Sequence, residues 1–397
     1  MAFAVCHVIQ SLDPKAGGPP AIAWKLATAQ KRRGHVVTMC AIEAVPDGES
    51  AHSQASVARL GELPLVALPR PNHVEAVFGK GVARSRLAEI VRKADVVHLH
   101  GVWDPILRLA ALEARAQGRP YLVLLNGMLD PWSLQQKWLK KRIALALGYR
   151  QLLDRAARLH FGNRDEQRLV QPLRLKAKGV IVPNGIDPAE VQSIAPGKFR
   201  QQFPILGDDP YVLFLGRLHV KKGLPCLAEA FSILTSQRSD ARLIVAGPDE
   251  GARQPFEAQI QRLGLGDRVH VVGPLYGEDK WAALNDAACL CLPSHQEGFS
   301  IALLESLASR LPVVISEECH FPEVAEEGAG LVVSRNPRAV AAALGQILAD
   351  DALRQRMGAA GRRLVEASYT WDKVAGQCDQ IYADVLSARP APLAQLC

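Results

Sequence analysis

The stretch CLCLPSHQEGFSIALLESLA, residues 289–308, contains the pattern that decides the fold. A short apolar run is followed by a loop with Pro293 and Gly298, and then by a second apolar run that opens near Ser300. This order predicts a strand, a loop and a helix, the unit from which parallel sheets are built. The amide N–H groups at the start of such a helix have no partner within the helix, which favours binding of a phosphate.

Two carboxylates flank this junction. Glu297 lies in the loop, and Glu305 lies about a turn and a half into the predicted helix. A carboxylate repels phosphate but accepts hydrogen bonds from hydroxyl groups, so the pair suggests a ligand with a diphosphate flanked by two polyols. A loop glutamate followed by a helix-surface glutamate is also common without any ligand, and the spacing alone leaves that explanation open.

Short apolar runs alternate with helix-like stretches along the whole chain. The runs cover residues 4–9, 35–41, 63–68, 95–100, 121–126 and 179–183, and then 211–216, 241–247, 268–273, 288–293, 311–316 and 330–334. Helix-like stretches such as 20–33, 83–93 and 105–117 lie between them. This alternation predicts two doubly wound α/β domains with parallel sheets. The length of 397 residues also exceeds what one core usually accommodates.

The domain boundaries follow from the interruption between the two sets of runs. We place an N-terminal domain at 1–185 and a C-terminal domain at 186–370, with the Pro-, Gly- and Asp-rich segment 183–210 as the linker. A predicted helix at 371–388 follows the second sheet, and we expect segment 371–397 to pack back across the domain boundary. In such folds ligands bind beyond the carboxyl ends of the strands, which would place a ligand between two facing sheets.

Composition excludes several classes of protein. No apolar run approaches the ~20 residues that a membrane span needs, and the beginning of the sequence lacks the pattern of a secretion signal, so we expect a cytoplasmic protein. The eight cysteines form no Cys-x-x-Cys pair, which favours reduced thiols over a zinc site or a disulfide framework. No nucleic-acid-binding motif occurs, and we expect no nucleic-acid partner.

The excess of positive charge is concentrated in one segment. The chain carries a net charge of +7, and residues 131–160 hold seven basic residues against one acidic residue, a net +6. On an ideal helix Trp138, Leu145, Tyr149 and Leu153 lie opposite a basic sector of Lys137, Lys140, Lys141, Arg155 and Arg158, although Gly148 interrupts it. Two interpretations remain open: a solvated face of a core-packed helix, or attraction of residues 137–158 to an anionic membrane surface or a phosphate-bearing acceptor.

A second element suited to phosphate occurs in FLGRLHVKKG, residues 214–223. A strand ends at Gly216, and the loop that follows offers Arg217 and Lys222. Arginine supplies a forked donor and lysine a mobile point charge, and both neutralise a diphosphate. Basic loop residues are usually only solvated, but two elements of this kind at carboxyl ends of strands in one domain favour a binding site.

With these motifs the chain resembles the retaining glycosyltransferases of family 4 over nearly its whole length. The matching motifs of the second half are GRLHVKKG, AGPDEG, PSHQEGFSIALLESLA, LPVV and FPEV, and those of the first half are GGPP, RRGH, DVVHLHGVW, NGMLDPW and VPNGID. The resemblance implies the GT-B architecture of two facing Rossmann-like domains with an inter-domain cleft. It also implies transfer of a hexose, with retention, from a nucleotide diphosphate sugar to a saccharide acceptor in surface polysaccharide biosynthesis.

The resemblance carries further expectations about partners. The acceptor would be a free or lipid-linked saccharide, and the protein would associate peripherally with the inner face of the membrane. No cofactor besides the donor substrate and no metal is implied, and the lack of an Asp-x-Asp motif agrees with metal-independent chemistry.

The resemblance also assigns roles residue by residue. Arg217 and Lys222 would hold the donor diphosphate, Glu297 would contact the transferred sugar, and Glu305 would bind the ribose. Further donor-binding positions are Gly17, Gly18, Gly216, Gly298, Phe299 and Ser300. Catalysis would rest on orientation and on stabilisation of the leaving diphosphate, whose own oxygen takes the acceptor proton.

Asn126 departs from the family pattern, since relatives with a similar motif carry a histidine that contacts the donor sugar. Asparagine forms hydrogen bonds but does not titrate near neutral pH. We count Asn126 with Arg217, Lys222 and Glu297 as a candidate catalytic residue and expect activity to survive. Two alternatives stay open: a non-catalytic protein that binds sugar nucleotides, and a sugar-nucleotide epimerase of the same architecture.

Residues of the acceptor side are predicted from the segment around DVVHLHG. His98 and His100 point to one face of a strand, and with Trp103 and Asp104 they could line the acceptor side, although a structural role is expected for His98. The sequence shows no supporting residues around the histidines at 35, 160, 219, 270 and 320. Asp130 and Trp132 either order an acceptor loop or, in the case of Asp130, cap the basic helix.

Overall fold

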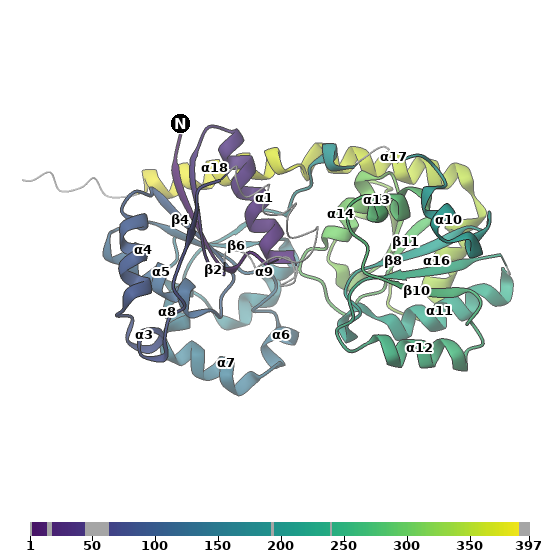
Figure 1. The fold of residues 1–397 in the computed structure, drawn as a ribbon, viewed down its shortest axis with the longest axis horizontal. Coiled ribbons are helices and arrows are strands. Elements are labelled where there is room, and N and C mark those ends of the chain that lie inside the picture. The colour runs from purple at the N-terminus through teal and green to yellow at the C-terminus, as the bar shows by residue number, and fades with distance from the viewer. Residues whose placement is uncertain (1, 14–17, 44–62, 192–193, 239, 389–397) are drawn as a thin grey trace, which may run out of the picture. The chain divides into compact units, whose positions relative to one another are not determined.

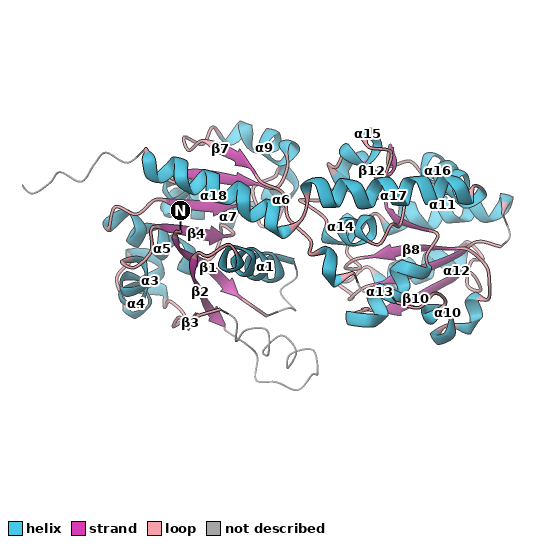
Figure 2. Cartoon of the chain, turned by 90° about the horizontal axis from the view of Figure 1, so that it is seen from above, coloured by secondary structure: helices cyan, strands magenta, loops and turns pink. Residues whose placement is uncertain are grey.

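The computed structural model describes residues 2–13, 18–43, 63–191, 194–238 and 240–388. These residues form two compact units, each an α/β sheet with helices on its faces (Figures 1 and 2). Unit 1 contains the chain up to Gly185 together with the part that begins at Trp371, and unit 2 contains Ile186–Thr370.

The sheet of unit 1 has seven parallel strands in the order β3-β2-β1-β4-β5-β6-β7. The strands are β1 (Ala4–Ser11), β2 (Val36–Glu43), β3 (Leu65–Ala67), β4 (Val96–His100), β5 (Tyr121–Leu124), β6 (Arg158–Phe161) and β7 (Gly179–Ile181). Strand order reverses between β1 and β4, which pair in register so that His7 lies beside His98. The predicted strands of this half are confirmed, but β6 was missed because its residues had been assigned to the basic helix.

Helices cover both faces of this sheet. They are α1 (Gly18–Arg32), α3 (His73–Phe78), α4 (Val82–Val91), α5 (Pro105–Ala116), α6 (Pro131–Gln135), α7 (Trp138–Ala144), α8 (Arg150–Asp154), α9 (Arg164–Val170) and α18 (Trp371–Ser387). Alternate residues of the central strands face opposite sides, so Cys6, Val8, Val97 and Leu99 join the apolar core with α4 and α5. The other face, which carries His7 and His98, packs against α1 and α18.

The interruption of the basic segment at Gly148 is confirmed, but the arrangement of side chains that an ideal helix implied is wrong. Gly148 has φ +114° and interrupts the segment within a kinked turn, Leu145–Tyr149, so α7 and α8 are separate. Arg158 lies in β6 rather than on a helix. Trp138 is 56% exposed and does not pack inward as the ideal helix implied. Lys141, one of the basic residues of the segment, donates to the backbone oxygen of Ser133 at 2.5 Å.

The sheet of unit 2 has six parallel strands in the order β10-β9-β8-β11-β12-β13. The strands are β8 (Tyr211–Leu215), β9 (Arg242–Ala246), β10 (Val269–Gly273), β11 (Cys289–Leu292), β12 (Val313–Ser316) and β13 (Gly330–Val333), and all were predicted. They are mainly apolar, as expected for a parallel sheet buried on both faces, with Arg242 at the start of β9 and His270 in β10 among the exceptions. Strand order reverses between β8 and β11.

The helices of unit 2 lie between these strands. They are α10 (Lys198–Gln202), α11 (Leu224–Gln237), α12 (Arg253–Arg262), α13 (Gly277–Asp286), α14 (Ile301–Ala308), α15 (Glu323–Glu326), α16 (Pro337–Ala349) and α17 (Asp351–Ser368), with single 3-10 turns at Pro188–Glu190, Pro204–Leu206, Val220–Lys222 and Glu317–Cys319. The interpretation of 183–210 as a linker is wrong for most of its length. Ile186 and Phe199 are buried in the core of unit 2, and Ile186 bridges to Thr370.

Candidate functional site

Each sheet has one point where the strand order reverses, and loops at the carboxyl ends of the two central strands diverge there. Ligands of doubly wound sheets bind at this point. In unit 2 the two loops follow β8 and β11 and contain Gly216–Gly223 and Pro293–Ser300. In unit 1 they follow β1 and β4, and β4 ends at His100. Predicted residues fall at both points, but Asn126 instead follows β5, the strand next to β4.

The loops of unit 2 bring Lys222 and Glu297 together. Lys222 Nζ lies 2.5 Å from Glu297 Oε1, and both side chains are largely buried. Ser294 Oγ donates to the same carboxylate oxygen at 2.7 Å. Both contacts are made by Oε1, so Glu297 is held by a cation and a hydroxyl. A largely buried ion pair of this kind orients both groups but is costly to break.

Gly223 makes this approach possible. It has φ +69°, and a Cβ placed on it would lie 1.8 Å from the carbonyl oxygen of Pro293. Only glycine fits a backbone contact that close. Lys221 also accepts a hydrogen bond at its carbonyl from the amide of His295, at 2.6 Å, so the two loops are joined through their main chains.

Arg217 has a different environment from Lys222. Its guanidinium donates to both carboxylate oxygens of Glu250, at 2.7 and 2.8 Å, and both side chains are exposed to solvent. Gly216, the first residue after β8, donates its amide to Ala246 O at 2.9 Å. An exposed pair contributes little to stability, so Arg217 can exchange Glu250 for an anionic ligand at low cost.

Glu305 is paired with Lys280, a residue that sequence reasoning missed. Lys280 Nζ of α13 lies 2.6 Å from Glu305 Oε1 on α14, and both side chains are mostly buried. Ser300 is the N-cap residue of α14 and forms no side-chain cap hydrogen bond. Phe299 packs against Phe321 and Tyr369 in tilted ring contacts, with ring centroids 5.4 and 5.8 Å away, which fixes the loop before α14. Gly298 lies between Glu297 and Phe299 in this loop.

In unit 1, Gly17 lies outside the described residues, and Gly18 is the first residue of α1. Asn126 follows β5 with φ +50°, and its amide nitrogen is buried without a hydrogen-bond partner among the described residues. The next amide, of Gly127, donates to Glu166 Oε1 at 2.5 Å, while Glu166 Oε2 accepts from Gly162 at 2.7 Å. Glu166, which sequence reasoning also missed, therefore holds the turn that contains Asn126.

The three predicted acceptor-side residues have structural contacts of their own. Asp104 caps α5 by accepting from the Ile106 amide at 2.9 Å, and burial raises its pKa. Trp103 Nε1 donates to Met128 O at 3.3 Å, and Lys141 lies over its ring. His100 is buried at the end of β4. Asp130 caps α6 through the Ser133 amide, as one of its two interpretations expected.

Four histidines gather on the sheet face that α1 and α18 cover. His7 and His98 lie in register on β1 and β4, His100 follows two residues on, and His160 comes from β6. Neighbouring rings lie 5.0 to 5.5 Å apart. The prediction that His160 has no supporting residues is therefore wrong, whereas the structural role expected for His98 agrees with its complete burial.

Burial keeps these histidines uncharged. It lowers the pKa of His7 to about 4, although the hydrogen bond to Gln30 opposes this, and it lowers the pKa of His160 to about 4. Burial, with repulsion from the neighbouring rings, also lowers the pKa values of His98 and His100 well below the ordinary value. A neutral imidazole has one donor and one acceptor, so the cluster is a set of directional hydrogen-bonding groups.

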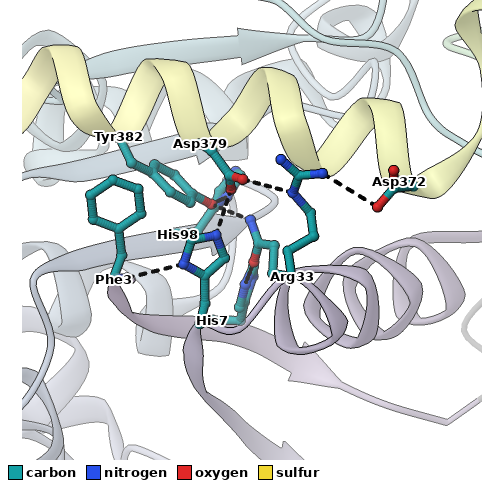
Figure 3. Close-up of polar contacts among 9 residues, drawn as sticks. Phe3, His7, Arg33, His98, Asp372, Asp379 and Tyr382 are labelled. Atoms are coloured by element: carbon teal, nitrogen blue, oxygen red, sulfur yellow. Dashed lines mark hydrogen bonds and ion pairs between the residues drawn. The ribbon is translucent and has the colours of Figure 1, made fainter. Parts of the chain in front are cut away.

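Helix α18 is attached to this face by polar contacts (Figure 3). Tyr382 reaches His98, and its hydroxyl lies 2.8 Å from His98 Nδ1. Asp379 accepts from Arg33 Nε at 2.7 Å and lies 2.9 Å from His35 Nε2. The prediction that His35 lacks supporting residues is wrong, because its other nitrogen also accepts from the Phe3 amide at 3.0 Å.

Comparison with protein families identifies both halves of the chain. Residues 17–185 match the family described as "Glycosyl transferase 4-like domain", and residues 197–364 match "Glycosyl transferases group 1". The first match contains strands β2 to β7 of unit 1, and the second contains the whole sheet of unit 2.

Several relatives are named as glycosyltransferases or mannosyltransferases. The phosphatidyl-myo-inositol mannosyltransferase of Mycobacterium leprae is 28% identical, and the match covers 94% of both chains. The GDP-mannose:cellobiosyl-diphosphopolyprenol alpha-mannosyltransferase of Xanthomonas oryzae pv. oryzae is 26% identical over 96% of this chain and 97% of the relative. The D-inositol 3-phosphate glycosyltransferase of Xylanimonas cellulosilytica is 31% identical, but only 53% of this chain and 52% of the relative are covered.

Solved structures share the fold. Anabaena HepE in complex with UDP and glucose superposes with a TM-score of 0.77 at 16% identity, covering 96% of this chain and 100% of that chain. Sucrose-phosphate synthase from Thermosynechococcus elongatus gives 0.74 at 21% identity, covering 98% and 100%. At such identities the likeness supports the two-domain GT-B fold alone.

Proposed function

Because the chain belongs to the group 1 glycosyltransferases and has their GT-B fold, we propose that it transfers a hexose with retention from a nucleotide diphosphate sugar to a saccharide acceptor in surface polysaccharide biosynthesis. The observation that carries the proposal is the pair of buried acid–lysine contacts in unit 2. Lys222 with Glu297 and Lys280 with Glu305 place two cations and two acids around the start of α14.

The Lys222–Glu297 pair suits the sugar and diphosphate end of a nucleotide sugar, and the Lys280–Glu305 pair suits its ribose end. Lys222 neutralises the diphosphate, with Arg217 as a second cation when it leaves Glu250. Glu297 faces the hexose hydroxyls. Glu305 accepts from the ribose hydroxyls while Lys280 contacts its Oε1 atom. The amides at the start of α14 add donors to the phosphate.

The reaction would proceed on one face of the donor. The acceptor hydroxyl oxygen forms a bond to the anomeric carbon as the bond from that carbon to the diphosphate oxygen breaks. The departing diphosphate takes the proton of the acceptor hydroxyl, and Lys222 stabilises the negative charge that develops on it. None of these steps uses a protein nucleophile or a metal.

Mannosyltransferase and UDP-sugar relatives suggest the donors to test. Transfer is measured with the full chain, GDP-mannose or UDP-glucose, and a panel of free and polyprenol-linked saccharides, with the product identified by mass spectrometry. We expect transfer with one donor and a loss of about 100-fold or more in Lys222→Met. Donor turnover that is equal in wild type and Lys222→Met would contradict the proposal.

Asn126 motivates a second candidate, a protein that binds sugar nucleotides without transferring them. Its amide nitrogen has no partner among the described residues, and it stands at a left-handed backbone position. This candidate predicts donor binding without product for any acceptor, and a gain of activity in Asn126→His. Epimerised donor without any transfer product would instead indicate an epimerase.

The basic segment supports an anionic membrane surface as a further partner. Trp138, Leu139 and Ile143 of α7 and Leu147 beyond it are 50 to 59% exposed. Lys137, Lys140 and Arg142 are exposed among them. Exposed apolar residues interspersed with cations are typical of helices that lie in a membrane interface. Within the described chain, the helices are too short or too polar to cross a bilayer.

Vesicle sedimentation tests this partner. We expect binding to vesicles with anionic lipid, weaker binding to neutral vesicles, and a several-fold loss in Leu139→Ser. Ile205→Ser is the matched control, because Ile205 is 60% exposed in unit 2. Equal sedimentation of both variants, or indifference to lipid charge, would contradict the membrane role.

A further inference from the structure

The buried polar groups of unit 1 form one continuous chain of hydrogen bonds. His160 Nε2 lies 2.8 Å from Val182 O, and His160 Nδ1 lies 3.2 Å from His98 Nε2. His98 Nδ1 lies 2.8 Å from the Tyr382 hydroxyl, to which Gln30 Nε2 donates at 2.9 Å. The chain continues from Gln30 to His7 and His100. It joins β6, β4, α18, α1 and β1, and Figure 3 shows its middle part.

The backbone carbonyl at one end fixes the position of every proton. Val182 O only accepts, so His160 carries its proton on Nε2, and its Nδ1 accepts from His98 Nε2. His98 Nδ1 must then accept, so the Tyr382 hydroxyl donates to it. That hydroxyl oxygen is left to accept, which agrees with its contact from the Gln30 amide nitrogen.

The same logic continues to the other end. Gln30 directs its amide nitrogen to Tyr382, so its oxygen accepts from His7 Nε2 at 2.7 Å. His7 Nδ1 therefore has no proton and accepts from His100 Nε2 at 2.8 Å. The remaining nitrogen, His100 Nδ1, must be an unprotonated acceptor. We call this set of six side chains the histidine relay: His7, Gln30, His98, His100, His160 and Tyr382.

His100 Nδ1 is the last atom of the relay. It is buried, and no described residue donates to it. The described part of unit 1 has three other such side-chain atoms, Thr28 Oγ1, Asn126 Nδ2 and Trp371 Nε1. Of these, Asn126 belongs to the loop after β5, and β5 pairs with β4 so that Leu124 lies beside His100. A spare acceptor and a spare donor therefore occur at the carboxyl ends of adjacent strands.

A hydroxyl group complements this combination, because it donates one hydrogen bond and accepts others. Sugars present several hydroxyl groups at short intervals. A phosphate does not suit His100 Nδ1, since both would be acceptors.

A metal ion is the competing explanation for the cluster. His7, His98 and His100 each have a ring nitrogen within 4.8 Å of the others. A metal ligand must offer a free lone pair, but the lone pairs of His7 and His98 already accept from His100 and Tyr382. Binding a metal would break those hydrogen bonds, whereas the relay satisfies every ring nitrogen except one.

We propose that His100 Nδ1 accepts a hydrogen bond from a hydroxyl of the saccharide acceptor, and that the histidine relay is the device that keeps this nitrogen unprotonated and fixed in direction. This inference rests on the proposed transferase function and adds to it the group that orients the acceptor. His100 contacts the substrate, whereas Tyr382 and Gln30 are positioning residues. His100 does not take the proton, because burial keeps it a weak base.

The C-terminal helix thereby has a role in the acceptor site. Tyr382 is the only group that connects His98 to Gln30 among the contacts of the relay. Without its hydroxyl, Gln30 can turn its amide over, and His7 is then free to carry its proton on Nδ1. His100 would in turn lose its preference and present an N–H at Nδ1, which cannot accept from a sugar.

Nitrogen NMR of the full chain labelled with 15N-histidine tests the protonation directly. At pH 7 we expect His100 to be protonated at Nε2 and bare at Nδ1, with the signal assigned by its absence in His100→Phe. Adding the free saccharides D-mannose, cellobiose or myo-inositol should shift the Nδ1 signal, and tetrahydropyran, a ring ether without hydroxyl groups, should not.

Kinetics of Tyr382→Phe test the relay. Tyr121→Phe is the matched control, since it removes a buried hydroxyl of the same unit that bonds Leu152 O at 2.7 Å and lies outside the relay. With the acceptor that supports transfer, we expect KM for the acceptor to rise about tenfold in Tyr382→Phe with kcat changed less than about threefold. The KM for the donor should stay constant, and Tyr121→Phe should leave both constants unchanged.

Several results would overturn the inference. They are a proton on His100 Nδ1 in the wild type, no saccharide-dependent shift at that nitrogen, equal kinetics of the two tyrosine variants, or a stoichiometric metal in the purified protein. Failure of the proposed function looks different, because the wild type would then transfer nothing while the protonation pattern of the relay remained as described. A thermal melt of each variant checks that it is folded.

Discussion

The two points of strand reversal share a topology and differ in chemistry. In unit 2 the loops after β8 and β11 hold charges, with Lys222 against Glu297 and Lys280 against Glu305. In unit 1 the strands β1 and β4 carry His7, His98 and His100, which burial keeps neutral. The same fold therefore offers a charged site suited to a diphosphate and an uncharged site suited to hydroxyl groups.

This contrast has a physical origin in where the polar groups lie. The charged side chains of unit 2 come from loops and helix surfaces beyond the sheet, where a charge keeps some contact with solvent or an opposite charge. The histidines of unit 1 are in the strands themselves, beneath α1 and α18. A charge there would be desolvated without a counter-charge, which costs several kcal/mol, so only neutral groups are tolerated.

Lowering the pH should give the largest effect, because it should destabilise unit 1 more than unit 2. The pKa values of His7 and His160 are about 4 in the folded chain and about 6.5 when unfolded. Their contribution to stability is complete above about pH 6.5 and is lost as the pH falls toward 4, by about 2 kcal/mol for each histidine between pH 7 and 5. Hydrogen exchange at both pH values should show β1, β4 and β6 losing protection before β8 and β11. Equal loss in both sheets would contradict the contrast.

Lys222→Met should have the next largest effect, because it leaves Glu297 buried without its cation. We expect unit 2 to lose about 3 kcal/mol of stability in addition to the lost transfer described above. If the double variant Lys222→Met/Glu297→Leu regains the lost stability, the unpaired carboxylate of Glu297 is its cause. A double variant as unstable as the single one would mean that the ion pair does not govern the local stability.

Gly223→Ala should disturb the same site through sterics alone. The new Cβ would meet Pro293 O at 1.8 Å, so the two loops must separate, at a cost of about 2 to 3 kcal/mol, and donor binding should weaken at least tenfold. Gly264→Ala is the control, since Gly264 has φ +70° but nothing within 4 Å of its Cβ position. That variant should lose about 1 kcal/mol and bind the donor normally. Calorimetric titration measures the donor affinity of the two variants. Equal affinities would show that close contact between the two loops is not required for donor binding.

Lys280→Met should have the smallest effect of the series on donor binding. Glu305 would lose the group that holds Oε1, so we expect the Kd of a nucleoside diphosphate to rise about tenfold. The Kd of the matching 2′,3′-dideoxynucleotide should change less, because it lacks the hydroxyls that Glu305 would bind. Equal changes for both nucleotides would mean that Lys280 acts only as a distant charge.

Much of the fold could be predicted from local pattern. Of the thirteen strands in the described residues, twelve correspond to short apolar runs, and the end of β11 with the start of α14 was predicted to within a residue. Strand β6 was missed because its first residue, Arg158, belongs to the basic segment that was projected on a helix, whereas the other three residues of the strand are buried. The kink at Gly148 shows why an ideal-helix projection of the basic segment failed.

The site was predicted in its residue types but not in its pairings. Spacing placed Lys222 and Glu297 in loops, yet nothing local shows that Lys222 pairs with Glu297 or that Lys280 meets Glu305. The relay depends on contacts between residues as far apart in sequence as Gln30 and Tyr382. The one local signal was the alternation of His98 and His100 on a buried strand, and it could not reveal Gln30 or His160.

The central claim is that unit 2 binds the diphosphate through its charged pairs while the neutral face of unit 1 does not. A crystal structure of the full chain with UDP or GDP tests it most directly. We predict diphosphate oxygens within hydrogen-bonding distance of Lys222 Nζ and ribose hydroxyls on Glu305. A diphosphate bound at the histidines of unit 1, or in unit 2 away from both lysines, would contradict the account.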